Sequence, residues 1–182
     1  MRTRPGILAI RTAIDPILGW VAPVGLAAAA GTALVLDLAP GELPYPGGRT
    51  VADMLDEGPS RSEMTPDRPG VAIVPGGGVR PVDAVDLVGQ IGAGWPAVVL
   101  RVGEESPWPL VPVSPALPGH LGIDGGSPAV WQLSMRGEAA PGPGPILPPL
   151  SRTIFRSLLR LELPMACAWV RAWRRVWDLP WR

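Results

Sequence analysis

Residues 16–36, PILGWVAPVGLAAAAGTALVL, decide the fold, because this run of 21 residues carries no charge and joins two local patterns. The first part is rich in Ala and predicts a helix over residues 20–30, which Gly31 would end as a C-terminal stop. The second part, ALVL at residues 33–36, predicts a short buried strand that ends at Asp37. We therefore expect a helix, a tight turn and a strand.

A membrane span over residues 16–36 is the alternative for the same stretch. About 20 apolar residues are enough to cross a bilayer, and Arg2, Arg4 and Arg11 precede the run, as the positive-inside rule asks. Asp15 at the edge of the run, two prolines and the weak hydrophobicity of Ala argue against a span. Both interpretations stay open at this point.

Five further apolar runs are typical of short buried strands. They alternate with two segments of helical pattern, at residues 50–57 and 82–91, and Thr50 with Asp53 forms a capping-box signal at the start of the first. Short continuous apolar strands that alternate with helices favour an α/β fold with a mainly parallel sheet flanked by helices. The expected strands cover residues 6–10, 71–74, 97–100, 110–113 and 129–133.

Composition and charge divide the chain into three parts. Residues 1–140 are expected to form the α/β domain, and the run PGPGPILPPL at 141–150 predicts a linker without regular structure. Residues 151–182 predict a helical segment, which Pro164 interrupts. Residues 1–150 carry 9 Arg and 14 acidic residues, whereas 151–182 carry 7 Arg and 2 acidic residues. A net charge of zero therefore hides an acidic body and a basic tail.

The composition also excludes several chemistries. The 182 residues include no Lys and no Asn, so all 16 positive side chains are Arg and every Lys-dependent mechanism is absent. One Cys and one His cannot build a Cys/His zinc site, and a single Cys cannot form an internal disulfide. We therefore expect a protein that is not an enzyme and holds no metal and no cofactor.

Five segments follow one another in a characteristic order: AAAAGTALVLDLAP at residues 27–40, TVADMLDE at 50–57, GVAIVPG at 70–76, WPAVVLRVG at 95–103 and GPILPPL at 144–150. In this order and spacing they resemble the MinD/ParA group of deviant P-loop ATPases, of the actinobacterial septum-site and pilus-assembly type. The resemblance covers most of the chain, and no single motif carries it. It implies a P-loop-NTPase-like fold in three layers, with WPAVVLRVG as the Walker B strand.

Two parts of the family's ATP site are missing in the matching positions. The family needs a Gly-rich loop with a Lys at the start of its first helix, where amides and Lys hold the phosphates. Residues 12–20 are TAIDPILGW here, without a Gly-rich turn or a Lys, and Asp15 would repel phosphate. The Walker B aspartate, which holds Mg²⁺, would fall near Leu100 or Arg101, and neither is acidic. The resemblance thus implies a pseudo-ATPase.

The strongest local pattern is a Trp at every fourth position near the C-terminus. A step of four residues turns a helix by about 400°, so the indoles would form a slanted stripe beside an Arg-rich face. Three interpretations stay open: a stripe packed on the protein's own core, an interfacial membrane helix, and a helix docked in the groove of a partner. The residues expected to bind a partner or a membrane are Trp169, Trp173, Trp177, Trp181, Arg171, Arg174 and Arg175.

The first functional hypothesis is a non-catalytic interaction or positioning protein. It would bind a protein partner, in a larger assembly or a homo-oligomer, or meet a membrane surface through its C-terminal helix, in the cytoplasm or at the inner face of the cell membrane. The second hypothesis is an active ATPase of the same family with an unrecognised site, and the third is a protein anchored by a span at residues 16–36. Nucleic acid is not an expected partner, because the basic charge is confined to one short segment and no binding motif for it occurs.

Overall fold

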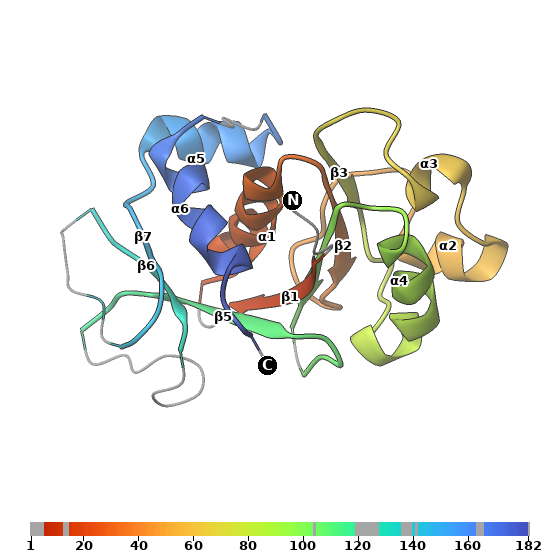
Figure 1. Ribbon diagram of the computed structural model, residues 1–182, viewed down its shortest axis with the longest axis horizontal. Coiled ribbons are helices and arrows are strands. Elements are labelled where there is room, and N and C mark those ends of the chain that lie inside the picture. Colours follow the sequence, from red (N-terminus) through yellow and green to blue (C-terminus); the bar gives the residue numbers. More distant parts are fainter. Residues whose placement is uncertain are drawn as a thin grey trace.

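The computed structural model describes residues 6–12, 15–103, 105–118, 128–135, 140, 142–162 and 166–181 (Figure 1). Within these residues the strands are β1 (Gly6–Thr12), β2 (Ala33–Leu38), β3 (Val71–Val74), β4 (Ala97–Val102), β5 (Leu110–Pro115), β6 (Val130–Gln132) and β7 (Ile146–Leu147). They form one sheet in the order β3-β2-β4-β1-β5-β6-β7, and all the neighbouring pairs are parallel. Every residue of β2 and β4 is buried, as is usual for central strands that helices cover on both faces.

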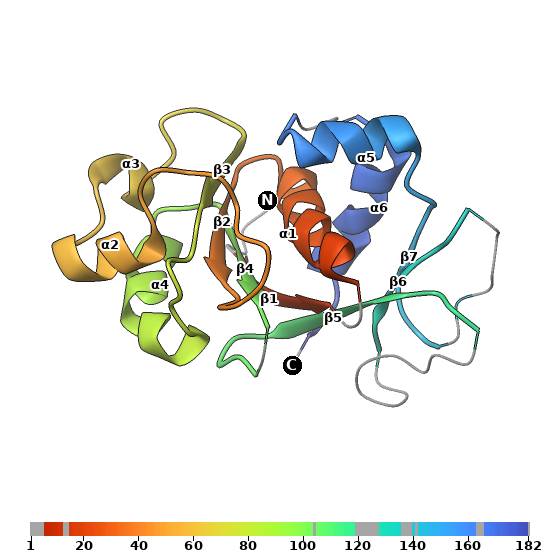
Figure 2. The same ribbon diagram turned by 180° about the vertical axis from the view of Figure 1, so that it is seen from behind.

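The helices lie on both faces of the sheet, so the molecule has three layers (Figures 1 and 2). One face packs against α1 (Pro16–Ala30), α5 (Arg152–Leu159) and α6 (Ala168–Trp177). The other face packs against α2 (Val51–Glu57), α3 (Arg61–Met64), the short 3₁₀ turn η1 (Pro81–Ala84) and α4 (Val85–Gly92). The expected α/β fold with a parallel sheet flanked by helices is confirmed.

The apolar stretch at residues 16–36 is divided between a helix and a strand. Helix α1 ends at Ala30, Gly31 adopts φ of 88° and donates its N–H to Ala28 O, and β2 begins at Ala33. The helix–turn–strand interpretation is therefore confirmed, and the alternative of a continuous membrane span over these residues is wrong. Across the part of the chain that is described, no helix is long and apolar enough to cross a membrane.

The Pro/Gly segment contains a strand that the sequence analysis did not predict. The expectation that residues 141–150 lack regular structure is wrong, because Ile146–Leu147 forms β7 beside β6. The pairing is held by Trp131 N–H, which donates to Pro145 O at 2.9 Å, and by Leu133 N–H, which donates to Leu147 O at 3.1 Å. Proline can flank such an edge strand because it still offers its carbonyl as an acceptor.

The C-terminal segment forms two helices rather than one long interrupted helix. Helix α5 begins at the Ser151 N-cap, whose side chain accepts a hydrogen bond from Ile154 N–H, and α6 begins after Cys167. Pro164, the expected interruption, lies outside the described residues. The predicted Thr50–Asp53 capping box at the start of α2 is present in full.

Helix α6 packs across α1 at a position where α1 has no side chain. All of residues 18–28 in α1 are buried, so this helix is apolar on every side and needs cover beyond that of the sheet. Gly25 admits the indole of Trp169 against the α1 backbone, and the rings of Trp169 and Trp173 meet edge to face with centroids 5.6 Å apart. The close crossing of the two helices therefore depends on a glycine.

Gly25→Ala should lower the free energy of unfolding by about 1–3 kcal/mol or more. The added Cβ would overlap the Trp169 ring and lie 2.7 Å from Trp173 Nε1, and neither buried indole has room to retreat. Gly89→Ala is the matched control, because Gly89 is an exposed residue of α4 with nothing within 4 Å of the new Cβ. The control should raise stability by about 0.5–1 kcal/mol in urea unfolding followed by circular dichroism. Equal effects of the two substitutions would contradict this account of the crossing.

Candidate functional site

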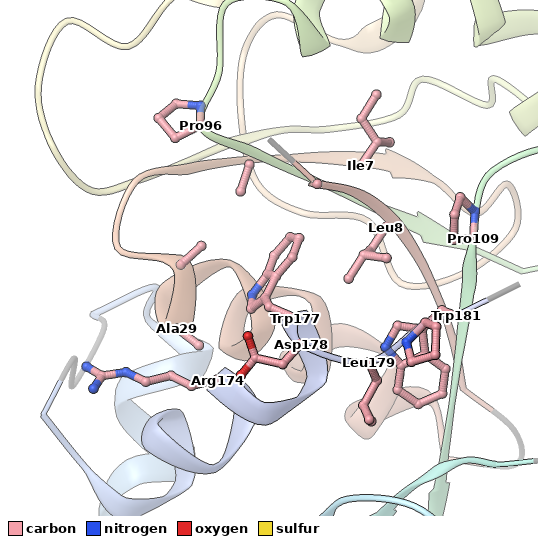
Figure 3. Close-up of a pocket in the computed structure, with 14 residues that line it drawn as sticks. Ile7, Leu8, Ala29, Pro96, Pro109, Arg174, Trp177, Asp178, Leu179 and Trp181 are labelled. Carbon is pink, nitrogen blue, oxygen red and sulfur yellow. The ribbon is translucent and has the colours of Figure 1, made fainter. Parts of the chain in front are cut away.

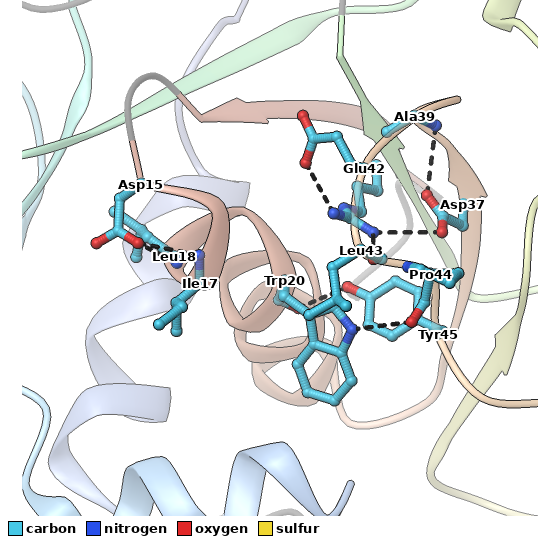
Figure 4. Close-up of polar contacts among 11 residues, drawn as sticks. Asp15, Ile17, Leu18, Trp20, Asp37, Ala39, Glu42, Leu43, Pro44 and Tyr45 are labelled. Atoms are coloured by element: carbon cyan, nitrogen blue, oxygen red, sulfur yellow. Dashed lines mark hydrogen bonds and ion pairs between the residues drawn. The ribbon is translucent and has the colours of Figure 1, made fainter.

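A buried ionic cluster lies at the carboxyl ends of two central strands. Asp37 on β2 and Arg101 on β4 are register partners, and the Arg101 side chain is only 2% exposed. Arg101 Nη1 donates to Asp37 Oδ2 at 3.3 Å and to Leu43 O at 2.6 Å, and Nη2 donates to Glu42 Oε2 at 2.7 Å. One guanidinium therefore ties the sheet to the loop that follows β2 (Figure 4).

Aromatic side chains hold the same loop to α1. Tyr45 donates its hydroxyl to Trp20 O at 2.6 Å, and Trp20 Nε1 donates to Pro44 O at 3.4 Å, as drawn in Figure 4. The Tyr45 ring lies 5.0 Å from the Trp20 ring, and the Arg101 guanidinium sits 5.3 Å from the Tyr45 centroid, within cation–π range. The loop thus closes over the edge where open α/β sheets usually bind their ligands.

Burial dominates the electrostatics of the cluster. It raises the pKa of Asp37 above the usual 3.8, although the Arg101 cation and the Ala39 amide act in the opposite direction. Burial also raises the pKa of Tyr45, so its hydroxyl keeps its proton and remains a donor. The Arg101 guanidinium is paired with the carboxylates of both Asp37 and Glu42.

The N-terminus of α1 is capped by the protein's own carboxylate. Asp15 Oδ1 accepts hydrogen bonds from the amides of Ile17 at 2.9 Å and Leu18 at 3.0 Å. In P-loop folds these first amides of the helix after β1 point at phosphate. Residues 13–14 of this connection lie outside the described residues. The amides of Ile17 and Leu18 already have an anionic acceptor here.

At the end of β4, the described residues nearest the position expected for a metal-binding aspartate are Leu100 and Arg101. Arg101 is one of the two residues near which the resemblance places the Walker B aspartate, and its charge would repel a divalent cation. Nowhere in the described ranges do three or more His, Cys, Asp or Glu side chains gather as metal ligands would. The chemistry of this edge is that of a closed structural ion pair.

The C-terminal stripe is divided between the core and the surface. Trp169 and Trp173 are 1% and 0% exposed and pack on α1, so these two indoles belong to the protein's own core. They are buried because the apolar face of α6 completes the cover of α1. Trp177 and Trp181 are half-buried. The three predicted basic residues, Arg171, Arg174 and Arg175, are all exposed.

Trp177 and Trp181 line a cavity of about 960 Å³ at the opposite end of the sheet (Figure 3). It lies between the end of α6 and the amino ends of β1 and β4, with Leu8 and Ala97 on its strand side. Both indole N–H groups are used within the chain, since Trp177 Nε1 donates to Leu26 O and Trp181 Nε1 donates to Val176 O. These two indoles therefore offer the cavity no free N–H donor, and polar groups of its lining come from other residues, including Arg174 and Asp178.

No local sequence pattern predicts the roles of Arg101, Glu42 and Tyr45. One signal was available, because a charged residue within the otherwise apolar strand AVVLRV must find a partner when the strand is buried. The partners Asp37 and Glu42 lie 64 and 59 residues away in the chain, so no local spacing pattern identifies them. Asp37 also caps the turn after β2, because its Oδ1 accepts a hydrogen bond from Ala39 N–H at 3.3 Å.

No protein-family model matches this chain, and no curated protein matches it. The resemblance to the MinD/ParA group therefore rests on the order of the quoted segments and remains a prediction.

Asp37→Asn should change how stability depends on pH. Because the folded pKa of Asp37 lies above the unfolded value, the unfolded chain loses this proton first as pH rises from 3.8. The stability that Asp37 contributes is thus full below 3.8 and falls as pH rises towards its folded pKa. In urea unfolding over this range, wild type should lose stability relative to Asp37→Asn as pH increases.

Asp53→Asn provides the comparison with the opposite sign. Hydrogen bonds from the Thr50 backbone and hydroxyl lower the pKa of Asp53, so wild type should gain stability relative to this variant as pH rises towards 3.8. Slopes of the same sign for the two variants would contradict the assigned causes of the shifts.

Trp173→Ala should destabilise the isolated protein by about 3–5 kcal/mol, the usual cost of truncating a fully buried large side chain. Arg174→Ala, its exposed neighbour, should stay within about 0.5 kcal/mol of wild type. Chemical unfolding followed by far-ultraviolet circular dichroism measures both, since the signal does not depend on the removed indole. A Trp173→Ala protein as stable as wild type would show that the stripe is not part of the core.

Proposed function

We propose that this chain is a non-catalytic interaction protein, a pseudo-ATPase-like α/β domain that binds a protein partner through the outer face of its C-terminal helices. The observation that carries the proposal is the Asp15 carboxylate on the amides of Ile17 and Leu18. A phosphate would have to displace this carboxylate and would then meet no Lys, since the chain contains none.

The strand edge supports the same proposal. A Mg²⁺ ion in a P-loop site needs a carboxylate at the end of the Walker B strand. Arg101 stands there instead, and its hydrogen bonds to Asp37, Glu42 and Leu43 leave the edge filled by protein. Phosphate binding and metal binding are both opposed, each by a different side chain.

The outer face of α6 supports an interaction role. Arg174 and Arg175 are exposed and have no ion-pair partner among the described residues. The apolar faces of α5 and α6 are turned inward, with Leu158, Trp169 and Trp173 all buried. An interfacial membrane helix needs its apolar face free to enter the lipid, so a protein partner fits this arrangement better than a bilayer.

Titration of the full chain with ATP·Mg²⁺ tests the proposal. We expect no binding by calorimetry at micromolar nucleotide and no phosphate release above the buffer rate. Gly19→Lys should not create turnover, because a side chain there meets Thr12 Oγ1 and Glu42 Oε2 and the metal carboxylate is still missing. Micromolar binding with turnover by the unmodified protein would overturn the proposal and favour an active ATPase with an unrecognised site.

The Asp15→Ala substitution tests whether the Asp15 helix cap alone prevents ATP turnover. Losing an N-cap carboxylate should cost about 1 kcal/mol of stability. The variant frees the two amides but supplies neither a Lys nor a metal ligand, so it should remain without ATPase activity. ATP turnover that appears in this variant would show that the Asp15 cap alone blocks a working site.

A further inference from the structure

The outer face of α5 and α6 carries a concentrated positive charge. Six arginines on the two helices are exposed, and only Glu162 and Asp178 offer negative charge in the described parts of residues 151–181. No ion pair joins any of the six to a carboxylate among the described residues. The six, called here the basic layer, are Arg152, Arg156, Arg160, Arg171, Arg174 and Arg175.

The layer on the other face of the sheet has the opposite charge. Residues 50–95, which include α2, α3 and α4, contain seven acidic residues and three arginines. Several of these charges are already paired, as in the Arg80–Asp83 and Arg49–Glu57 contacts. The exposed carboxylates of this acidic layer that have no ion-pair partner among the described residues are Asp56, Asp67 and Asp86.

The two layers cannot neutralise each other within one molecule. Figures 1 and 2 show α5 and α6 on one side of the sheet and α2, α3 and α4 on the other. A helix is about 10 Å across, so the outer faces of the two helical layers are separated by more than 20 Å. The Debye length at physiological ionic strength is about 8 Å, and the attraction across the molecule is therefore screened.

Both layers also expose apolar side chains among their charges. Leu55, Val82 and Val85 on the acidic layer are 41%, 59% and 44% exposed, and Leu159 and Leu179 beside the basic layer are 44% and 41% exposed. A non-obligate protein–protein interface is about as apolar as the rest of the protein surface, so this mixture of charged and apolar groups is compatible with such a contact. The two surfaces of this chain are thus complementary in charge and similar in polarity.

We infer that the acidic layer of one copy of this chain docks on the basic layer of a second copy. The inference rests on the proposed interaction role and names its partner. Because the two surfaces differ and lie on opposite sides of the molecule, the contact is heterologous and leaves a free surface at each end. Copies therefore add head to tail, and electrostatic complementarity makes the association fast and sensitive to salt.

Sedimentation velocity of the full chain over a range of concentrations tests the inference. The average mass should rise with protein concentration at about 0.01 M salt and return to the monomer at about 1 M, where the Debye length has fallen from about 30 Å to about 3 Å. A wild-type protein that stays monomeric at low salt and high concentration overturns the inference.

Two charge-reversal variants identify the surfaces. Arg152→Glu with Arg171→Glu reverses charge near the N-terminal ends of α5 and α6, where acidic residues suit the helix dipole. The second change also removes the hydrogen bond that Arg171 Nη1 donates to Ala166 O at 2.7 Å, so urea unfolding of the double variant must first show that it is folded. Asp56→Arg with Asp67→Arg reverses charge in the acidic layer. Each double variant alone should lose at least about tenfold in association constant, which is about 1.4 kcal/mol.

The mixture of the two double variants decides the question. Two substitutions bring each altered layer to a net charge near zero, but the unchanged acidic layer of one variant still matches the unchanged basic layer of the other, so an equimolar mixture should associate again as heterodimers. Glu105→Arg, an exposed reversal outside both layers, is the control for net charge and should associate like wild type. Failure of the mixture to associate, or loss of association in the control, overturns the inference.

An anionic membrane is also complementary in charge to the basic layer. Vesicles of phosphatidylcholine with phosphatidylglycerol test this alternative. Vesicle binding that Arg152→Glu with Arg171→Glu abolishes, in a protein that remains monomeric, would assign the layer to a membrane and overturn self-association. If the protein stays monomeric and does not bind ATP, the inference of self-association is wrong and the pseudo-ATPase proposal is unaffected. ATP hydrolysis by a protein that self-associates overturns the pseudo-ATPase proposal alone.

Discussion

Helix α1 sets the constraint on which the rest of the structure depends, because it is apolar around its whole circumference. Residues 18–28 of this helix are buried without exception, and the sheet can cover only one side of it. The remaining sides are covered by α5 and α6, which follow it by more than 120 residues in the chain. The Trp stripe is therefore required by the fold before it can serve any partner, and Gly25 is where the two helices come closest.

The closed carboxyl edge follows from a second constraint, the burial of Arg101. A guanidinium that is 2% exposed must be paired, and removing one partner of a buried pair costs about 3–5 kcal/mol. Asp37, Glu42 and the Leu43 carbonyl meet this need together, which draws the loop after β2 over the edge. The same edge is where parallel α/β folds place their ligands, so the stability of the core and the closure of the site have one cause.

Local patterns predict the elements well where burial and periodicity agree. The strands at residues 33–36, 71–74 and 97–100 and the capping box at Thr50 lie where the sequence indicates them. Strand β7 was missed because its pairing with β6 comes from the sheet rather than from its Pro-rich sequence. The Trp stripe predicted an apolar helix face but not its partner, since periodicity describes a face and carries no information on what covers it. The Arg101 cluster was missed for a related reason, because its members meet only through the register of β2 and β4.

The inner and outer sides of α6 are subject to different physical constraints, so a substitution on one side need not affect the other. Its inner side is held by packing, since Trp173 lies among α1 side chains and tolerates little change in volume. Its outer side carries Arg174 and Arg175 in water, where substitution alters stability little. The separation of charge into a basic layer and an acidic layer is therefore a property of the outer faces, because neither the packing of the core nor the buried Arg101 pair requires it.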